Sequence, residues 1–455
     1  MQTATHSKTL TAPDSDQLQL GPAAARRLFL VGAGFAAGGL VTAAALGLRS
    51  PEARRLLVHG YLVAFSFYLA ITLGALFFVL LHHLARAGWS VTLRRLAEGL
   101  SGNVGLMAVL AIPVLLGMGQ LYEWSHAAAV AHDPILQGKR VFLNPTAFVL
   151  RMVFYFAVWG GLAWYFRSRS IRQDATGDVQ LSVRMERIAA PGMFALAVTL
   201  TFAAVDLLMS LNPHWQSSIF GVYFFADCVL AGLVTLTLLA RWLQSQGRLG
   251  AAVTTEHYHD LGKLTFAFVF FWGYVAFSQY VLIWYANIPE ETQFFIPRQI
   301  GPWAHVSILL AACHLLIPFA GLLSRHAKRR LGVLTFWCVW LLGAVLLDLF
   351  WIVMPSAFIQ EIPHAAGAAP GTPLPVALPA LVASNQAIYQ LAEQHAGFMQ
   401  HVAAPLQPLS VLVVLALVVG MGGLYLAVTV RCLRRAALVA IRDPRLPEAL
   451  AFENG

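Results

Sequence analysis

Long apolar runs alternate with short polar segments along most of the chain. Each run holds about 20 residues, the length at which a helix crosses the hydrocarbon core of a bilayer. A crossing segment must be helical, because an open strand would leave backbone groups unpaired in lipid. Ten such runs occur, over residues 28–48, 57–81, 104–121, 146–166, 188–211, 218–243, 263–286, 303–324, 332–354 and 408–430. The pattern therefore predicts an all-α polytopic membrane protein with about ten transmembrane helices.

The composition agrees with this class, since 58% of the 455 residues are hydrophobic and 11% are charged, against about 25% charged in soluble domains. Basic residues also alternate between loops. Of 30 Lys and Arg residues, 23 lie on the side of the two termini, six lie on the other side, and Arg151 falls within the fourth run. Cytoplasmic loops carry the excess of Lys and Arg, so we expect both termini in the cytoplasm. The net charge of +9 then reflects these loops, and we expect no nucleic-acid partner.

The fifth and ninth runs end in similar segments. At Asp206 and at Asp348, an Asp-Leu pair is followed by proline seven positions after the aspartate. Both runs point outward and the ninth follows the fifth by four helices, which favours an internal repeat of two four-helix bundles, helices 2–5 and 6–9.

The predicted order follows from this repeat. It is a disordered cytoplasmic tail (1–26), flanking helix 1 (27–50), the first bundle (51–212), the second bundle (213–355), a periplasmic loop with a helix over 380–402 (356–407), and flanking helix 10 with a cytoplasmic tail (408–455). Arg26 and Arg27 also resemble the core of an export signal. The alternation of charge disfavours that alternative.

Polar groups at membrane depth are the candidates for function, because a charge near the bilayer centre costs about 2.5–3.5 kcal/mol on insertion scales. Arg151 and Asp206 lie at similar depth on neighbouring helices, a spacing that fits a structural ion pair. Asp227 lies near mid-membrane with Tyr223 one turn away, and His314 lies at similar depth. A polar stripe on the seventh run comprises Lys263, Tyr274, Ser278 and Tyr285.

These groups predict a proton path, because carboxylate, imidazole and hydroxyl groups each accept and pass on a proton. The candidates are Asp227, His314, Tyr274, Ser278, Lys263, Asp206, Asp348, Arg151 and Tyr223. Ordinary interhelical hydrogen bonding is the alternative explanation.

No motif for a bound redox cofactor occurs. The four cysteines have no paired spacing and no Cys-x-x-Cys-His run exists, which excludes covalent haem c and argues against iron–sulfur ligation. The histidines lack the paired spacing of stacked b-type haems, and there is no Walker or Rossmann motif. We therefore expect this chain to bind no redox cofactor and no metal.

Two long segments carry a family resemblance. After Asp206, the first reads Leu-Asn-Pro-His-Trp-Gln-Ser-Ser-Ile-Phe-Gly-Val-Tyr-Phe-Phe (211–225). The second comprises His-Asp-Leu-Gly-Lys (259–263), Phe-Ser-Gln-Tyr (277–280) and Ile-Trp-Tyr-Ala-Asn-Ile-Pro-Glu-Glu-Thr (283–292). Together with the ten-helix layout, they resemble the F subunit of bacterial alternative complex III, which is similar to the membrane subunit of polysulfide reductase. Gln216 and Ser218 depart from the pattern. The signature positions are Asp206, His214, Asp260, Lys263, Gln279 and Glu290.

The resemblance implies a subunit of a respiratory quinol:electron acceptor oxidoreductase in the bacterial inner (cytoplasmic) membrane. In that family the complex oxidises quinol and passes electrons to a periplasmic cytochrome c or directly to a terminal oxidase. The implied partners are a related ten-helix quinol-binding subunit, an iron–sulfur subunit, and multihaem and monohaem cytochrome c subunits. Haem c and iron–sulfur clusters would then lie in partner subunits, and this chain would contribute proton translocation and assembly surface.

Other interpretations stay open. A quinol-binding subunit of the same complex would need a carboxylate and a histidine near the outer face, for which Asp206 and His214 are candidates. A secondary transporter would show helices broken at corresponding positions of the two halves, and a structural scaffold would need neither. His257, His259 and Asp260 lie at the cytoplasmic mouth of the seventh run, where they would collect protons or form a solvated loop cluster.

Overall fold

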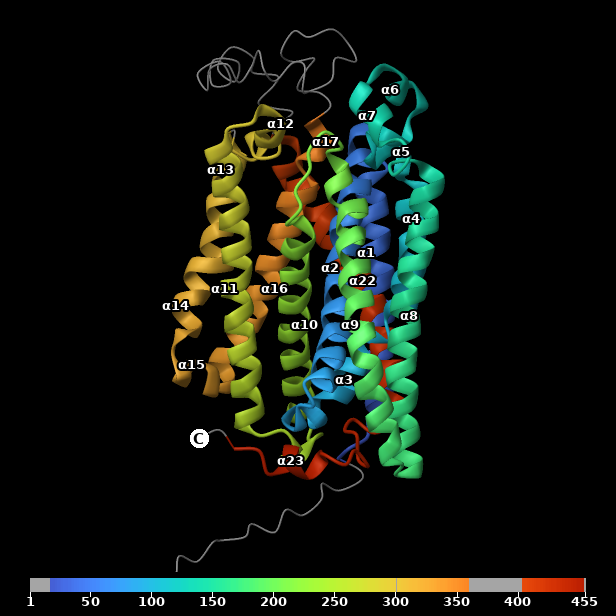
Figure 1. Cartoon of the computed structure of the whole chain (residues 1–455), viewed down its shortest axis with the longest axis vertical. Coiled ribbons are helices and arrows are strands. Elements are labelled where there is room, and N and C mark those ends of the chain that lie inside the picture. The colour runs from blue at the N-terminus through green and yellow to red at the C-terminus, as the bar shows by residue number, and fades with distance from the viewer. Residues whose placement is uncertain (1–16, 300, 360–402, 454–455) are drawn as a thin grey trace, which may run out of the picture.

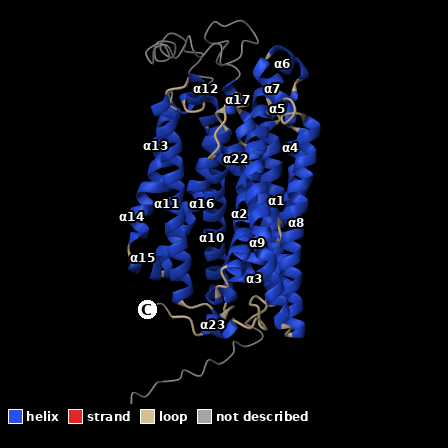
Figure 2. Ribbon diagram, in the orientation of Figure 1, coloured by secondary structure: helices blue, strands red, loops and turns tan. Residues whose placement is uncertain are grey.

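A computed structural model describes residues 17–299, 301–359 and 403–453. Every regular element in these residues is a helix, and ten spans are long and apolar enough to cross a membrane (Figures 1 and 2). The spans are α1 (Pro22–Gly47), α2 (Pro51–Leu84), α3 with α4 (Val91–Ser101, Val104–Leu116), α8 (Pro145–Thr176), α9 (Val179–Leu207), α10 (Phe220–Ser245), α11 (Thr255–Ala286), α13 with α14 (Pro302–Leu310, Ile317–Leu323), α16 (Leu331–Val353) and α22 (Pro408–Arg434). The predicted all-α polytopic membrane fold is confirmed.

Short helices cap the two ends of the bundle. They are α5 (Met118–Leu121), α6 (Ala127–His132), α7 (Pro134–Lys139), α12 (Pro289–Thr292), α15 (Arg325–Arg329), α17 (Ser356–Ile359) and α23 (Leu446–Leu450). We call the end that carries α15 and α23 the basic end, and the end that carries α5–α7, α12 and α17 the far end (Figure 1).

The long helices pack in two sets that meet at the centre. In the first set α2 contacts α3, α4 and α9, while α8 contacts α4 and α9; in the second, α10 contacts α11 and α16, and α11 contacts α14. The central contact joins α2 to α10. There a Cβ on Gly74 would lie 1.7 Å from the carbonyl oxygen of Cys228. Glycine thus allows the two backbones to touch, as small residues do between membrane helices.

The flanking helices α1 and α22 pair with each other and pack on α2. A Cβ on Gly39 would lie 2.4 Å from the backbone nitrogen of Gly420. This pair again uses small residues for close approach.

Both ends of the described chain are tied to the basic end. The prediction of a disordered tail over 1–26 is wrong for its described part, because Leu18 and Leu20 are buried and α1 begins at Pro22. The Leu438 amide donates to the Leu18 carbonyl at 2.7 Å, which fixes the tail against the carboxyl-terminal segment. The predicted helix over 380–402 lies outside the described residues.

Candidate functional site

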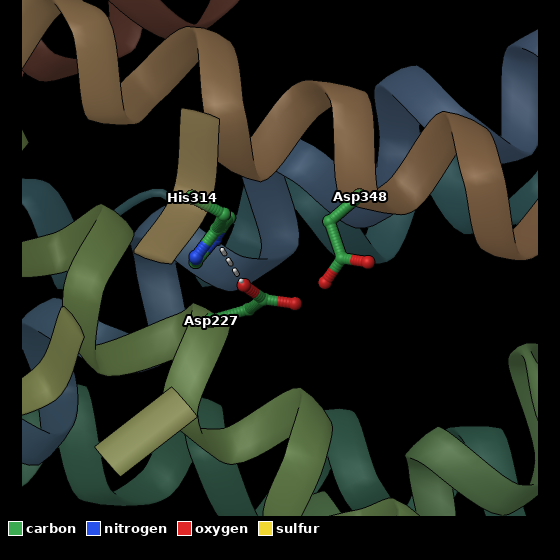
Figure 3. A group of neighbouring side chains, drawn as sticks. All are labelled: Asp227, His314 and Asp348. Atoms are coloured by element: carbon green, nitrogen blue, oxygen red, sulfur yellow. Dashed lines mark ion pairs between the residues drawn. The ribbon is translucent and has the colours of Figure 1, made fainter. Parts of the chain in front are cut away.

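Three buried ionisable residues of the second helix set meet inside the membrane region. Asp227 comes from α10, Asp348 from α16 and His314 from the eighth span, and one ligand-type atom of each lies within 4.8 Å of the others (Figure 3). All three side chains are 0% exposed. The Nε2 atom of His314 lies 3.2 Å from Oδ1 of Asp227. The sequence predicted each residue separately, and the fold brings them together as the Asp227–His314–Asp348 cluster.

A break in regular helix places His314 in this cluster. Residues Ala311–Leu316 form a π-helical turn between α13 and α14. Such turns are rare and often occur at functional sites. The turn carries His314 on its buried side, while His305, one helix earlier in the same span, is exposed.

Hydrogen bonds fix one carboxylate of the cluster and leave the other groups unsatisfied. The Tyr223 hydroxyl donates to Oδ1 of Asp348 at 2.5 Å, and the Trp272 indole donates to Oδ2 at 3.1 Å. The Trp272 ring also stacks on His314, with ring centroids 3.8 Å apart. In the described part of the chain, neither oxygen of Asp227 and neither ring nitrogen of His314 has a hydrogen-bond partner. Buried polar atoms are rarely left so, which sets Asp227 and His314 apart from the fully hydrogen-bonded Asp348.

One fixed cation lies beside the cluster at the far end. Arg298 is 2% exposed and donates to the carbonyl oxygens of Phe294, Trp351 and Ile352. Burial lowers the pKa of Arg298 to about 9, so its guanidinium keeps its charge at neutral pH. Two carboxylates this close repel each other in a low-dielectric site, and Arg298, the one arginine that we find beside them in the described residues, does not balance both. The charge balance therefore favours one proton held within the cluster.

In the first helix set, Asp206 is paired with a cation. Arg151 donates from Nη2 to Oδ1 of Asp206 at 2.6 Å and from Nε to Oδ2 at 2.9 Å. The Tyr155 hydroxyl adds a third hydrogen bond at 2.8 Å. The expected ion pair between Arg151 and Asp206 thus forms. Because both carboxylate oxygens are occupied by a fixed cation and a hydroxyl, Asp206 belongs to a structural pair.

The polar stripe of the seventh span does not join the cluster. Tyr274 is 60% exposed and Tyr285 is 90% exposed, and the Lys263 side chain is 48% exposed and pairs with Asp260 at 2.6 Å. Ser278 is half-buried on the same outward side. The four stripe residues do share one face of α11, as predicted, but that face points outward. The helix buries the face that carries Trp272 and Gln279 instead. The prediction that Lys263, Tyr274, Ser278 and Tyr285 join the buried cluster is therefore wrong.

The expected pair of Asp206 with His214 is also corrected. His214 instead donates to Asp133, which caps α7 by accepting from the amides of Ile135 and Leu136. Burial alone would raise the pKa of Asp133, but the interaction with His214 and the hydrogen bonds from the Leu136 and Ile135 amides together hold that pKa below its ordinary value. His214 thus anchors the far-end helices.

The expected proton-collecting cluster at the base of the seventh span is largely buried. His257 is 0% exposed, accepts from the Thr254 amide in a helix cap, and meets the ring of Phe452. His259 is 5% exposed and lies 3.8 Å from Asp260. The carboxyl-terminal segment covers this position through Phe452. The two histidines are therefore buried, and the solvated loop cluster that was the alternative does not form.

Sequence reasoning missed a buried charge network at the basic end of the first helix set. The third span begins before residue 104, the start predicted from hydropathy. Its first helix, α3, carries three buried charged residues, Arg94, Arg95 and Glu98. Arg95 pairs with Glu98 at 3.1 Å and with Asp174 at 2.8 Å, and Arg94 pairs with Asp443 of the carboxyl-terminal segment. The spacing of Arg95 and Glu98 was the available signal, but hydropathy placed these residues in a loop.

A cavity of about 500 Å³ lies next to the cluster, towards the far end between α11 and α13. Tyr223 and Trp272 form its inner wall. Phe277 and Ile308 line its mouth and are 66% and 69% exposed on the outer surface of the bundle. Gln279 also lines it and is 5% exposed. The cavity therefore opens toward the membrane and leads to the two side chains that hold Asp348.

Comparison with known proteins gives no relative: no protein-family model matches the chain, and no curated protein matches it.

Proposed function

We propose that this chain is an integral membrane subunit of a respiratory quinol-oxidising complex of the alternative complex III type. In this role it sits in the bacterial inner membrane with the basic end in the cytoplasm. Partner subunits hold the haem c and iron–sulfur centres and pass electrons to a cytochrome c or a terminal oxidase. This chain contributes assembly surface and a path for protons. The two sequence segments that resemble the F subunit support the assignment to that complex.

The Asp227–His314–Asp348 cluster is the observation that carries the proton-path proposal. Asp348 is held by Tyr223 and Trp272, whereas Asp227 and His314 present unsatisfied atoms to it. A proton moving from Asp348 to Asp227 travels a short distance and then meets His314 at 3.2 Å. Buried carboxylates and histidines in transmembrane helices serve as proton relays in this way.

A second candidate function is binding of the quinol in the cavity beside Tyr223. The cavity opens to the membrane through Phe277 and Ile308, which suits a ligand with an isoprenoid tail. Its Gln279 amide can hydrogen-bond one ring oxygen of a quinol, and the Tyr223 hydroxyl, whose own hydrogen is donated to Asp348, can accept a hydrogen bond from the other. Pockets of this kind are mostly apolar with a few placed polar groups. This site replaces the Asp206–His214 site expected from the sequence.

The complex assignment is tested by purification of the tagged full-length chain from native membranes in mild detergent. We expect multihaem c-type cytochrome and iron–sulfur subunits by mass spectrometry, a haem spectrum, and quinol oxidation. A chain that purifies alone and without haem would overturn the assignment.

The second candidate is tested by photolabelling that intact assembly with an azidoquinone and mapping the labelled peptides. Ala276→Phe fills the cavity wall and is expected to remove labelling from the α11 and α13 peptides. Ala267→Phe places the same ring on an exposed position of α11 outside the cavity and serves as the matched control. Equal labelling in the two variants would rule out the cavity as the quinol site.

A further inference from the structure

A basic pocket lies where α1 and α22 meet at the basic end. The pocket has a volume of about 570 Å³ and is lined by Arg26, Arg431, Arg434 and Arg435, with no acidic residue in its wall. Arg431 and Arg434 are one turn apart on the last turns of α22, and Arg26 comes from the second turn of α1. Four guanidinium groups from two helices thus surround one space.

These four arginines have no acidic partner in the described part of the chain. No ion pair or side-chain hydrogen bond involves any of them, although arginines elsewhere at this end, such as Arg94 and Arg95, are paired with carboxylates. All four side chains are exposed. The mutual repulsion of four like charges calls for an anion between them.

The remainder of the pocket is apolar and continues along the membrane surface. Pro22, Ala25, Phe29 and Val430 complete its wall. Phe29 is 49% exposed, and Leu30 and Phe35 of the same helix are 58% and 54% exposed. An anion bound by the arginines would therefore have hydrocarbon surface directly beside it, which suits a molecule with acyl chains.

We propose that this pocket binds the headgroup of an anionic phospholipid, with its phosphate among the four arginines and its acyl chains along Phe29 and the exposed face of α1. Basic pockets between membrane helices on the cytoplasmic side bind such headgroups. The lipid would hold the α1–α22 pair in place by bridging the two helices at the end where their glycine contacts stop. The inference is independent of the respiratory assignment.

The test uses the purified full-length chain with its partners, stripped of lipid in detergent and titrated with cardiolipin, phosphatidylglycerol or phosphatidylethanolamine. Native mass spectrometry reads bound lipid. We expect retention of the two anionic lipids over phosphatidylethanolamine, and about 30-fold weaker binding in Arg431→Gln/Arg434→Gln. The matched control Arg184→Gln/Arg187→Gln removes two exposed charges from the same end outside the pocket and is expected to bind as the wild type does.

Three results would overturn the proposal. Equal binding of phosphatidylethanolamine and cardiolipin would remove the role of charge. Equal weakening in both arginine variants would show general surface attraction. Displacement of the lipid by inorganic phosphate at equal concentration would identify a phosphate site without lipid specificity. Because the readout is bound lipid, a failure of the respiratory assignment leaves this test unaffected.

Discussion

Asp206 and Asp348 occupy matching places in the two halves of the sequence, yet their surroundings differ. Asp206 on α9 is bound by Arg151 and Tyr155, so both of its oxygens meet a donor and its charge meets a cation. Asp348 on α16 is bound by two neutral donors and faces a second carboxylate, that of Asp227.

The difference shows that an aspartate in the same Asp-Leu sequence context can lie in two different electrostatic environments. A paired carboxylate in the membrane holds helices together, because removing either partner leaves a buried charge. A carboxylate that is hydrogen-bonded by neutral donors and lies beside another carboxylate and a histidine is suited to exchange a proton. The first helix set is therefore expected to be structural at this depth, and the second set is expected to carry the proton.

The largest expected effect comes from breaking the pair in the first set. Arg151→Gln leaves Asp206 buried without a cation, and we expect a loss of about 3 kcal/mol in the free energy of unfolding. The loss is measured by thermal unfolding in detergent, with size-exclusion chromatography as the readout of folded protein. The double variant Arg151→Gln/Asp206→Asn removes both charges and is expected to recover more than half of the loss. A single variant as stable as the wild type would refute the structural assignment.

The next effect separates stability from proton transfer. Asp227→Asn keeps the size of the side chain, and the aspartate it replaces makes no hydrogen bond in the described residues, so stability is expected to change little. Proton translocation driven by quinol oxidation in liposomes is expected to fall at least about tenfold, because the amide cannot carry the proton. Unchanged translocation in this variant would remove Asp227 from the path.

A smaller effect is expected from the donors that hold Asp348. Tyr223→Phe removes the 2.5 Å hydrogen bond from the tyrosine hydroxyl to Oδ1 of Asp348. A loss of about 1 kcal/mol in stability follows from the net value of an intramolecular hydrogen bond, with slower proton translocation in liposomes. If proton translocation in Tyr223→Phe matched that of the wild type, the hydroxyl would have no part in the transfer.

The smallest effects are expected on the outward stripe of α11. Tyr274→Phe and Ser278→Ala change groups that face away from the cluster, so stability is expected to stay within about 0.5 kcal/mol of the wild type. Proton translocation is expected to stay unchanged, which makes Tyr274→Phe the control for Tyr223→Phe. A loss of translocation in either stripe variant would return the stripe to the proton path.

Hydropathy and charge alternation sufficed to predict the spans and their class, because lipid imposes length and polarity on each helix separately. They also flagged Asp227, His314 and Asp348 as unusual. Hydropathy and charge alternation could not predict which side chains meet across helices. The face that α11 buries and the π-helical turn at Ala311–Leu316 depend on packing between helices. The buried network of Arg95 and Glu98 escaped for the same reason, because its polar residues are compensated only in three dimensions.

Infrared difference spectroscopy tests the central contrast most directly, because a protonated buried carboxyl has a carbonyl band that an ionised carboxylate lacks. We expect the wild type to show such a band, sensitive to exchange in heavy water, that disappears in Asp227→Asn or Asp348→Asn. The double variant Arg151→Gln/Asp206→Asn is expected to keep it. A band that is lost with Asp206 and kept without Asp227 would place the proton in the first helix set and contradict the account.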